Sequence, residues 1–333
     1  MKASPFILKP AAKDYLWGGT RLNDDFNKGI DIDPLAETWE CSTHPDGESV
    51  VATGEFSGSK LSDVLKAHPE FLGSHPLSNL PEGAAPQLPI LIKFIDAKSD
   101  LSVQVHPTDE YALEHENGQL GKTEMWYVLD VVKDTKLVYG FHNDVNETML
   151  RDAISDGSLE KYMQKIPVKK DDVFFIEAGT VHAIGAGCLI AEIQENSNLT
   201  YRLYDYNRTD KEGKLRELHI DKAMAVANMK SSSAPRQPMR VMNFHKGYAT
   251  ELLGRCKYFN VERMLLNTEV TRELPVFATS ANSFQVLLCT KGCGVLTYEN
   301  SALNIYRGDC VFIPSESVEF SLHGKANMLR VTC

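Results

Sequence analysis

Residues 101–107 read Leu-Ser-Val-Gln-Val-His-Pro. Apolar side chains occupy positions 101, 103 and 105 and polar side chains occupy 102, 104 and 106, which is the period of a β-strand with one buried face. The polar face places Gln104 and His106 about 7 Å apart along the strand, so both side chains can converge on one ion. The same pattern is also typical of an ordinary amphipathic strand whose polar face meets solvent.

Short strand-like segments of this kind recur along the chain. They are rich in Val, Ile, Tyr and Phe, are separated by Gly, Pro, Asn and Asp, and cover residues 88–95, 101–105, 124–129, 136–139, 172–176, 188–194, 200–204, 284–289, 294–298, 310–313 and 328–331. Helical spacing is confined to residues 61–67, to 147–166, where Gly157 divides the pattern, and to 217–229. Because helices do not alternate regularly with strands, the sequence predicts an all-β fold of barrels or jelly rolls rather than a doubly wound sheet.

Composition and charge narrow the class of protein. The chain has 333 residues, of which 43% are hydrophobic and 24% charged, as in a soluble globular protein. Its net charge of −10 makes a nucleic-acid or anionic-membrane partner an unexpected one. No apolar run approaches the roughly 18 residues of a membrane span, and we expect no signal peptide. The seven cysteines are odd in number and form no Cys-x-x-Cys pair, so we expect reduced thiols and a cytoplasmic protein.

Two further segments can complete a metal site with Gln104 and His106. Glu124 begins the next strand-like segment, and His182 follows a turn that contains Gly179. Two imidazoles, one carboxylate and one amide oxygen form a ligand set suited to zinc or another divalent first-row ion. Positions left open for water or substrate would make such a site catalytic. Each piece alone is weak, because a single histidine is most often only a hydrogen-bonded side chain.

The spacing of these residues resembles the two metal-binding motifs of the cupin superfamily. The chain resembles more closely the type I mannose-6-phosphate isomerases (phosphomannose isomerases), in their short bacterial form. The resemblance covers most of residues 5–229 and rests on Trp17-Gly18-Gly19, Glu37-Thr38-Trp39-Glu40, His44-Pro45, Gln104-Val105-His106-Pro107, Lys122-Thr123-Glu124, Gly179-Thr180-Val181-His182-Ala183 and Tyr201-Arg202-Leu203-Tyr204-Asp205. It implies two cupin-like (jelly-roll) β-barrels with a few inserted helices. It also implies a metal-dependent aldose–ketose isomerase that interconverts mannose 6-phosphate and fructose 6-phosphate.

The resemblance further implies roles for individual residues. It implies one bound divalent ion, expected to be Zn2+, whose ligands are Gln104, His106, Glu124 and His182. The residues implied to bind substrate are Lys93, Ser102, Lys122 and Arg202, and those implied in catalysis are Arg202, Lys122 and Glu192. Two departures matter, because Thr123 replaces a proline of the family and Glu177 stands where related sequences often have one. Ile184 stands where the long eukaryotic form has a tyrosine, so no role of that tyrosine transfers.

The chemistry of this isomerisation suits these residue types. Moving a carbonyl between C1 and C2 removes a carbon-bound proton and passes through an enediol, with negative charge on the two oxygens. A divalent cation or a guanidinium aimed at those oxygens lowers the barrier, which is the role expected of Arg202. A phosphate favours Lys, Arg and Ser donors. The proton carrier could be a lysine, Glu192 or a metal-bound water, and the sequence does not choose among them. Strand alternation would place Thr200, Arg202 and Tyr204 on one face.

Residues 230–238, Lys-Ser-Ser-Ser-Ala-Pro-Arg-Gln-Pro, are predicted to form a linker. The linker divides the chain into a metal-binding catalytic cupin domain with helical insertions, residues 1–230, and a C-terminal cupin-like domain, residues 240–333. Residues 306–314 resemble the approach to a second cupin motif, but Glu316 and Glu319 stand at its glycine and histidine positions. We therefore expect no metal ligands in the second domain, and a role in packing within a monomer or homodimer.

Two alternatives stay open from the sequence. One is another cupin metalloenzyme, such as an iron oxygenase, because ligand type alone does not exclude iron. The other is a sensor or regulator that binds a sugar phosphate without turnover, for which Thr123 and Glu177 leave room. The cationic set of Lys93, Lys122 and Arg202 favours a phosphorylated sugar as the small-molecule partner.

Overall fold

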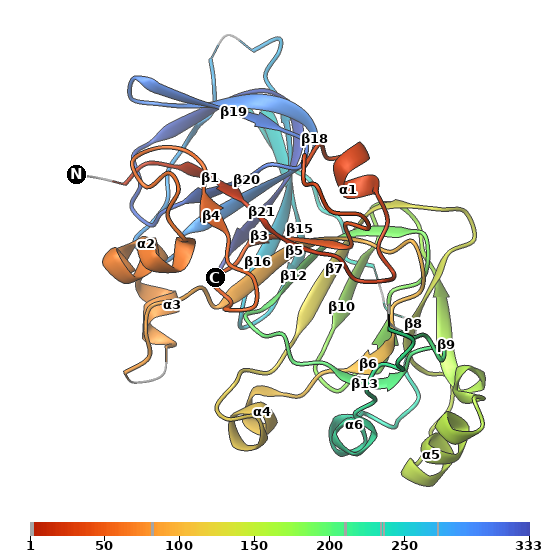
Figure 1. Cartoon of the computed structure of the whole chain (residues 1–333). Coiled ribbons are helices and arrows are strands. Elements are labelled where there is room, and N and C mark those ends of the chain that lie inside the picture. Colours follow the sequence, from red (N-terminus) through yellow and green to blue (C-terminus); the bar gives the residue numbers. More distant parts are fainter. Residues whose placement is uncertain (1–2, 81–82, 210–211, 234, 236, 272) are drawn as a thin grey trace.

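Three antiparallel sheets build the molecule, and short helices lie below and beside them (Figure 1). The computed structural model describes residues 3–80, 83–209, 212–233, 235, 237–271 and 273–333. The predicted mostly β fold with few helices is confirmed. In this part of the chain, no helix is both long and apolar enough to cross a membrane.

The six- and five-stranded sheets enclose the space in which the predicted site residues meet. The six-stranded sheet has the order β10 (Val173–Ile176), β7 (Glu124–Val131), β12 (Cys188–Glu195), β5 (Ile90–Asp96), β3 (Glu37–Cys41) and β2 (Ala11–Lys13). The five-stranded sheet has the order β13 (Tyr201–Tyr204), β6 (Val103–Val105), β11 (His182–Ala183), β8 (Lys136–Phe141) and β9 (Met163–Pro167). An apolar cluster packs between them, with Trp126 and Ile190 from the first sheet and Leu137 from the second.

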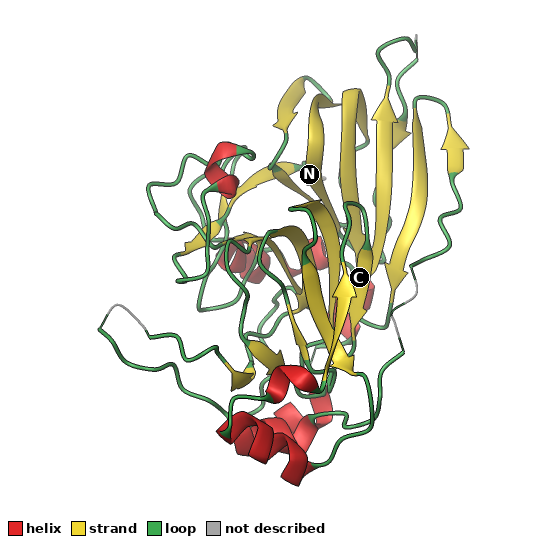
Figure 2. Ribbon diagram, turned by 90° about the vertical axis from the view of Figure 1, so that its right-hand side faces the viewer, coloured by secondary structure: helices red, strands yellow, loops and turns green. Residues whose placement is uncertain are grey.

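Helices cover the outer face of the five-stranded sheet. Val103, Val105 and Phe141 of the sheet pack against Leu150 and Met224 of the helices. The elements on this side are α4 (Asp109–His115), α5 (Glu147–Ser155), the 3-10 helix η2 (Leu159–Lys161) and α6 (Ile220–Val226). Figure 2 shows helices at the lower end of the molecule, beneath the long strands.

The ten-stranded sheet packs on the other face of the six-stranded sheet. Its order is β14 (Asn243–His245), β15 (Tyr248–Arg255), β16 (Asn260–Asn267), β21 (Phe320–Thr332), β18 (Gln285–Tyr298), β20 (Cys310–Ile313), β1 (Phe6–Lys9) and β4 (Val50–Val51), with β17 (Val276–Phe277) on β21 and β19 (Ser301–Tyr306) on β18. Successive side chains of a strand point to opposite faces. Leu288 therefore joins the core shared with Ile92 and Phe94 of β5, whereas Leu287 points into a second core of its own sheet.

The first eighty residues add the remaining helices, which lie beside the ten-stranded sheet (Figure 1). They are α1 (Arg21–Asp24), α2 (Leu61–Ala67), the 3-10 helix η1 (Pro69–Leu72) and α3 (Ser74–Ser78). The chain start also enters the ten-stranded sheet, because β1 pairs with β20 and sets Phe6 opposite Phe312. The sheet thus takes strands from both sides of the predicted linker. Within that linker Ser231 forms an isolated bridge to Phe141, and Ala234 and Arg236 lie outside the described residues. The division into domains stays a prediction.

Three local predictions differ from the structure. The helical pattern at 147–166 is divided at Gly157 as predicted, where φ is a left-handed 73°, and continues only as the 3-10 helix η2. It is wrong from Met163, where strand β9 begins. The segments at 284–289 and 294–298 form one strand, β18, whose register shifts between Cys289 and Lys291. Strand β6 begins at Val103, and Leu101 before it joins the cluster between the two sheets rather than the face of Val103 and Val105.

Candidate metal centre and substrate cavity

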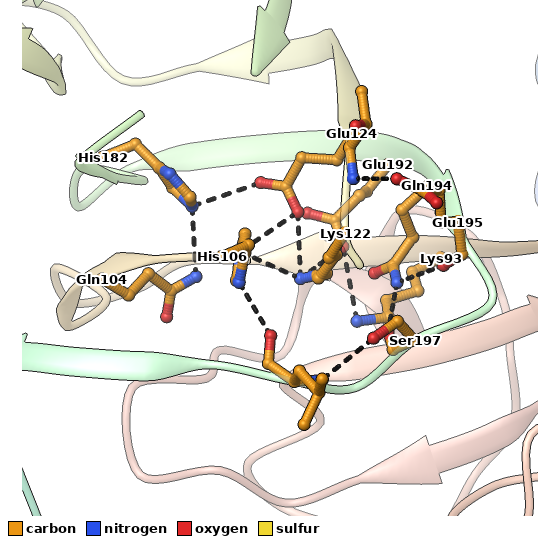
Figure 3. A network of polar contacts seen from close by, with 12 residues as sticks. Lys93, Gln104, His106, Lys122, Glu124, His182, Glu192, Gln194, Glu195 and Ser197 are labelled. Carbon is orange, nitrogen blue, oxygen red and sulfur yellow. Dashed lines mark hydrogen bonds and ion pairs between the residues drawn. The ribbon is translucent and has the colours of Figure 1, made fainter. Parts of the chain in front are cut away.

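Strand pairing brings the predicted metal ligands together. Gln104 on β6 lies opposite His182 on β11 and, on its other side, opposite Arg202 on β13. Glu124 reaches the same point from β7 of the facing sheet (Figure 3). Ligand atoms of His106, Glu124 and His182 all lie within 4.8 Å of one another, and each of the three residues is at most 1% exposed.

Both histidines present an unprotonated nitrogen to this point. His106 Nδ1 lies 2.8 Å from the carbonyl oxygen of Leu199, and His182 Nδ1 lies 2.8 Å from that of Thr180. A carbonyl oxygen only accepts hydrogen bonds, so each Nδ1 carries the proton and each Nε2 keeps a lone pair. Burial lowers the pKa of His182 to about 4 and the pKa of His106 well below its ordinary value. The two rings are therefore neutral near pH 7, as metal ligation requires.

Glu124 supplies the anionic part of the cluster. Its Oε1 lies 3.3 Å from His182 Nε2 and its Oε2 lies 3.5 Å from His106 Nε2 and 2.9 Å from Lys122 Nζ. Burial and the neighbouring Glu192 raise the pKa of this carboxyl to about 7. The ammonium group of Lys122 compensates Oε2, whereas Oε1 has no hydrogen-bond donor. A buried carboxylate oxygen without a donor costs free energy unless a cation compensates it, so this donor set fits a divalent ion.

Gln104 completes the ring of predicted ligands. Its Nε2 lies 3.4 Å from His182 Nε2, and its Oε1 lies 3.4 Å from Ser102 Oγ. A half-turn of the amide group exchanges these two atoms and would aim the oxygen at the space between the imidazoles. The position suits the fourth ligand predicted from the sequence.

A row of charged residues crosses the six-stranded sheet beside the cluster. Glu192 lies opposite Lys93 on one neighbouring strand and Trp126 on the other. Its Oε2 accepts a hydrogen bond from Trp126 Nε1 at 2.9 Å, and its Oε1 lies 3.3 Å from Lys93 Nζ and 3.9 Å from Lys122 Nζ. Burial opposes the charge on Glu192, but Lys122 and Lys93 outweigh it and lower the pKa. Burial likewise opposes the charge on Lys93, and Glu37 and Glu192 raise its pKa.

Arg202 enters from the five-stranded sheet. Its Nε donates a hydrogen bond to Ser102 Oγ at 3.3 Å, and its Nη1 donates to the carbonyl oxygen of Glu217 at 2.8 Å. Asp205, a candidate partner for Arg202, is ion-paired to Arg208 and Arg216. The predicted face of Thr200, Arg202 and Tyr204 is interrupted, because the register shifts between Arg202 and Tyr204 and the latter packs on the helix-covered side.

A cavity of about 250 Å3 opens beside the metal ligands. The predicted residues that line it are Lys93, Ser102, Gln104, Lys122, Glu192 and Arg202. Tyr15, Trp17, Glu37, Asn198, Thr200 and Arg216 also line it and were assigned no role from the sequence. The parity of β3 could have indicated Glu37, whose neighbour Trp39 lies opposite Lys93. Arg216 lies outside any strand, so no periodicity marks it.

The fold defines a protein of the cupin class, and its His-Glu-His cluster is compatible with a metal site. Residues 6–127 match the model of the phosphomannose isomerase type I catalytic domain, and residues 249–333 match that of the mannose-6-phosphate isomerase cupin domain. The chain is 37% identical to the mannose-6-phosphate isomerase ManA of Bacillus subtilis, over 99% of each chain. It is 44% identical to a probable mannose-6-phosphate isomerase, GmuF, of the same organism, over 67% of this chain and 68% of the relative. The chain belongs to the type I phosphomannose isomerase family.

Solved structures agree with this membership. The crystal structure of the mannose 6-phosphate isomerase from Bacillus subtilis superposes with a TM-score of 0.88 at 32% identity and covers 99% of both chains. A mannose 6-phosphate isomerase bound with zinc and yttrium superposes with a TM-score of 0.72 over 99% of both chains. Its 17% identity makes it a relative in fold.

Proposed function

We propose that the chain interconverts mannose 6-phosphate and fructose 6-phosphate in the cavity between the two sheets, with Zn2+ held by Gln104, His106, Glu124 and His182. One observation carries the proposal. Two neutral imidazole nitrogens face a buried carboxylate, one oxygen of which lacks a hydrogen-bond donor, beside a cavity lined by Lys93 and Arg202. The names of the relatives and the zinc in one structural neighbour support the reaction and the metal.

Residues lining the cavity have separate roles in stabilising the enediolate and in binding the substrate. A bound divalent ion supplies positive charge to the sugar oxygens on which negative charge develops. Arg202, anchored by Ser102 and Glu217, directs its guanidinium at the same oxygens and stabilises the enediolate. Lys93, Ser102 and Lys122 line the cavity and bind the phosphorylated sugar.

Glu192 is the best proton acceptor among the candidates. Its lowered pKa keeps it anionic, and it lines the cavity with Oε1 beside Lys93 while Trp126 holds Oε2. Lys93 has a raised pKa and stays protonated, so it serves as a charge partner instead. Glu192 then returns the proton to the neighbouring carbon. Lys122 stands between Glu124 and Glu192 and can give a proton to one sugar oxygen and regain one from the other.

Turnover separates this proposal from a sensor that only binds. The purified protein, loaded with Zn2+, is incubated with mannose 6-phosphate, and fructose 6-phosphate is followed by NMR. Conversion supports the isomerase. A folded, metal-loaded protein that binds the sugar phosphate without converting it would favour the sensor and overturn the proposal. We also propose a cytoplasmic location, supported by the free state of all seven cysteines. The assembly as monomer or homodimer stays a prediction.

A further inference from the structure

Two carboxyl groups hold the backbone on both sides of Lys122. Gly121 N donates a hydrogen bond to Asp109 Oδ1 at 3.0 Å, and Thr123 N donates one to Glu195 Oε1 at 2.6 Å. The approach at Gly121 is close, since a Cβ there would lie 2.5 Å from Asp109 N. Thr123, which replaces the family's proline, thus has an N–H that this chain uses. Lys122 lies in the segment that leads into β7 and has little freedom to shift while both bonds are made.

The second oxygen of Asp109 is bound by the C-terminal half of the chain. Tyr258 Oη donates a hydrogen bond to Asp109 Oδ2 at 2.6 Å, and Lys257 Nζ lies 3.2 Å from the same oxygen. Both residues belong to the turn between β15 and β16. The carboxyl group of Glu195 is close enough to Asp109 for Asp109 to raise its pKa. A continuous path of hydrogen bonds therefore runs from the ten-stranded sheet to the backbone of Lys122.

We propose that Tyr258 is a positioning residue, through which the C-terminal half fixes Lys122 beside Glu124 and Glu192. The inference rests on the proposed function, in which Lys122 binds substrate and moves a proton. Tyr258 does not line the cavity, so its hydroxyl acts on turnover through Asp109. A tether of this kind lowers the cost of ordering the ammonium group in the transition state.

The first test removes only the hydroxyl. Tyr258→Phe keeps the ring that packs against the shared core. We expect kcat to fall about fivefold, which is about 1 kcal/mol of activation free energy, with KM within about twofold and zinc content unchanged. Tyr306→Phe is the matched control, since Tyr306 is 60% exposed on β19 of the same half. An unchanged kcat in Tyr258→Phe would overturn the proposal.

The second test asks whether Tyr258 acts through Asp109. Asp109→Asn should lower kcat, and adding Tyr258→Phe to it should lower kcat no further, because the two groups form one path. Glu195→Gln keeps an oxygen for Thr123 N–H, so it should retain kcat within about twofold, whereas Glu195→Leu removes that oxygen and should lower kcat further. Additive losses for Asp109→Asn and Tyr258→Phe would show that the tyrosine acts by another route and would overturn the inference.

Hydrogen exchange separates this inference from the proposed function. The amides of residues 121 and 123 should exchange faster in Tyr258→Phe than in the wild type, and no faster in Tyr306→Phe. This readout needs no turnover. A wild type that lacks isomerase activity would refute the proposed function even if exchange changes, whereas an active wild type with unchanged exchange in Tyr258→Phe would refute the tether.

Discussion

Glu192→Gln removes one negative charge from the buried row beside the metal ligands and changes little else in shape. The charge lies 3.3 Å from Lys93 Nζ and 3.9 Å from Lys122 Nζ. With an effective dielectric constant of about 20, these pairs are worth about 5 and about 4 kcal/mol. The variant also escapes the cost of burying the carboxylate, which is several kcal/mol. Lys93 keeps Glu37 at 3.7 Å and Lys122 keeps Glu124 at 2.9 Å.

The net result should be a loss of about 3 kcal/mol in the free energy of unfolding, at the lower end of the range for a broken buried pair. Urea denaturation of the metal-free protein at pH 7 measures this loss. Glu262→Gln is the matched control, because its ion pair with Arg330 is partly exposed, 21% and 27% at the two side chains, and should cost at most about 1 kcal/mol. A loss below about 1 kcal/mol for Glu192→Gln, no larger than the control, would refute the reasoning. Turnover of the variant should also fall by at least about 100-fold.

Three further changes have defined outcomes. Arg202→Ala should lower kcat/KM by about 100- to 1,000-fold and leave zinc content intact; loss of the metal as well, seen by atomic absorption, would mean that its role is misplaced. His182→Ala should lose Zn2+ in a competition assay with a chromogenic chelator, because it removes one of three clustered ligands; wild-type affinity would contradict the assigned site. Burial and Asp109 raise the pKa of Glu195 from 4.5 to about 8, so the native state binds this proton more tightly than the unfolded state. Stability should therefore fall as the pH rises from about 4.5 through about 8. Between pH 6 and pH 8.5 the free energy of unfolding should fall by about 2 kcal/mol more in the wild type than in Glu195→Gln, as measured by urea denaturation. Equal falls in the two proteins would disprove this.

Much of the fold follows from local patterns. The alternation at 101–107 predicted Gln104 and His106 on one face of a strand. In the structure Gln104 lies in β6 and His106 directly follows it, while Val103 and Val105 pack into the core under α5 and α6. Local patterns did not predict β9, because its apolar residues fit a helical period as well as a strand. Pairing with β8, which sets Ile166 opposite Leu137, decides between the two.

The pairing of distant strands is beyond a local pattern. The antiparallel contact of β1 with β20 joins segments about three hundred residues apart, and neither segment specifies its partner. The lysine at 122 shows the same limit. Its place beside Glu124 agrees with the two-residue spacing of the pair, but its tether to Asp109 and Tyr258 depends on a loop and a turn without periodicity.

Titration of the metal-free protein with zinc tests the central claim most directly. The protein is stripped of metal, Zn2+ is added in steps, and the conversion of mannose 6-phosphate to fructose 6-phosphate is measured at each step. The account predicts no activity without metal and full activity at one Zn2+ per chain, with none regained by His182→Ala. Full turnover in the stripped protein, or in His182→Ala, would contradict a metal-dependent isomerase at this site.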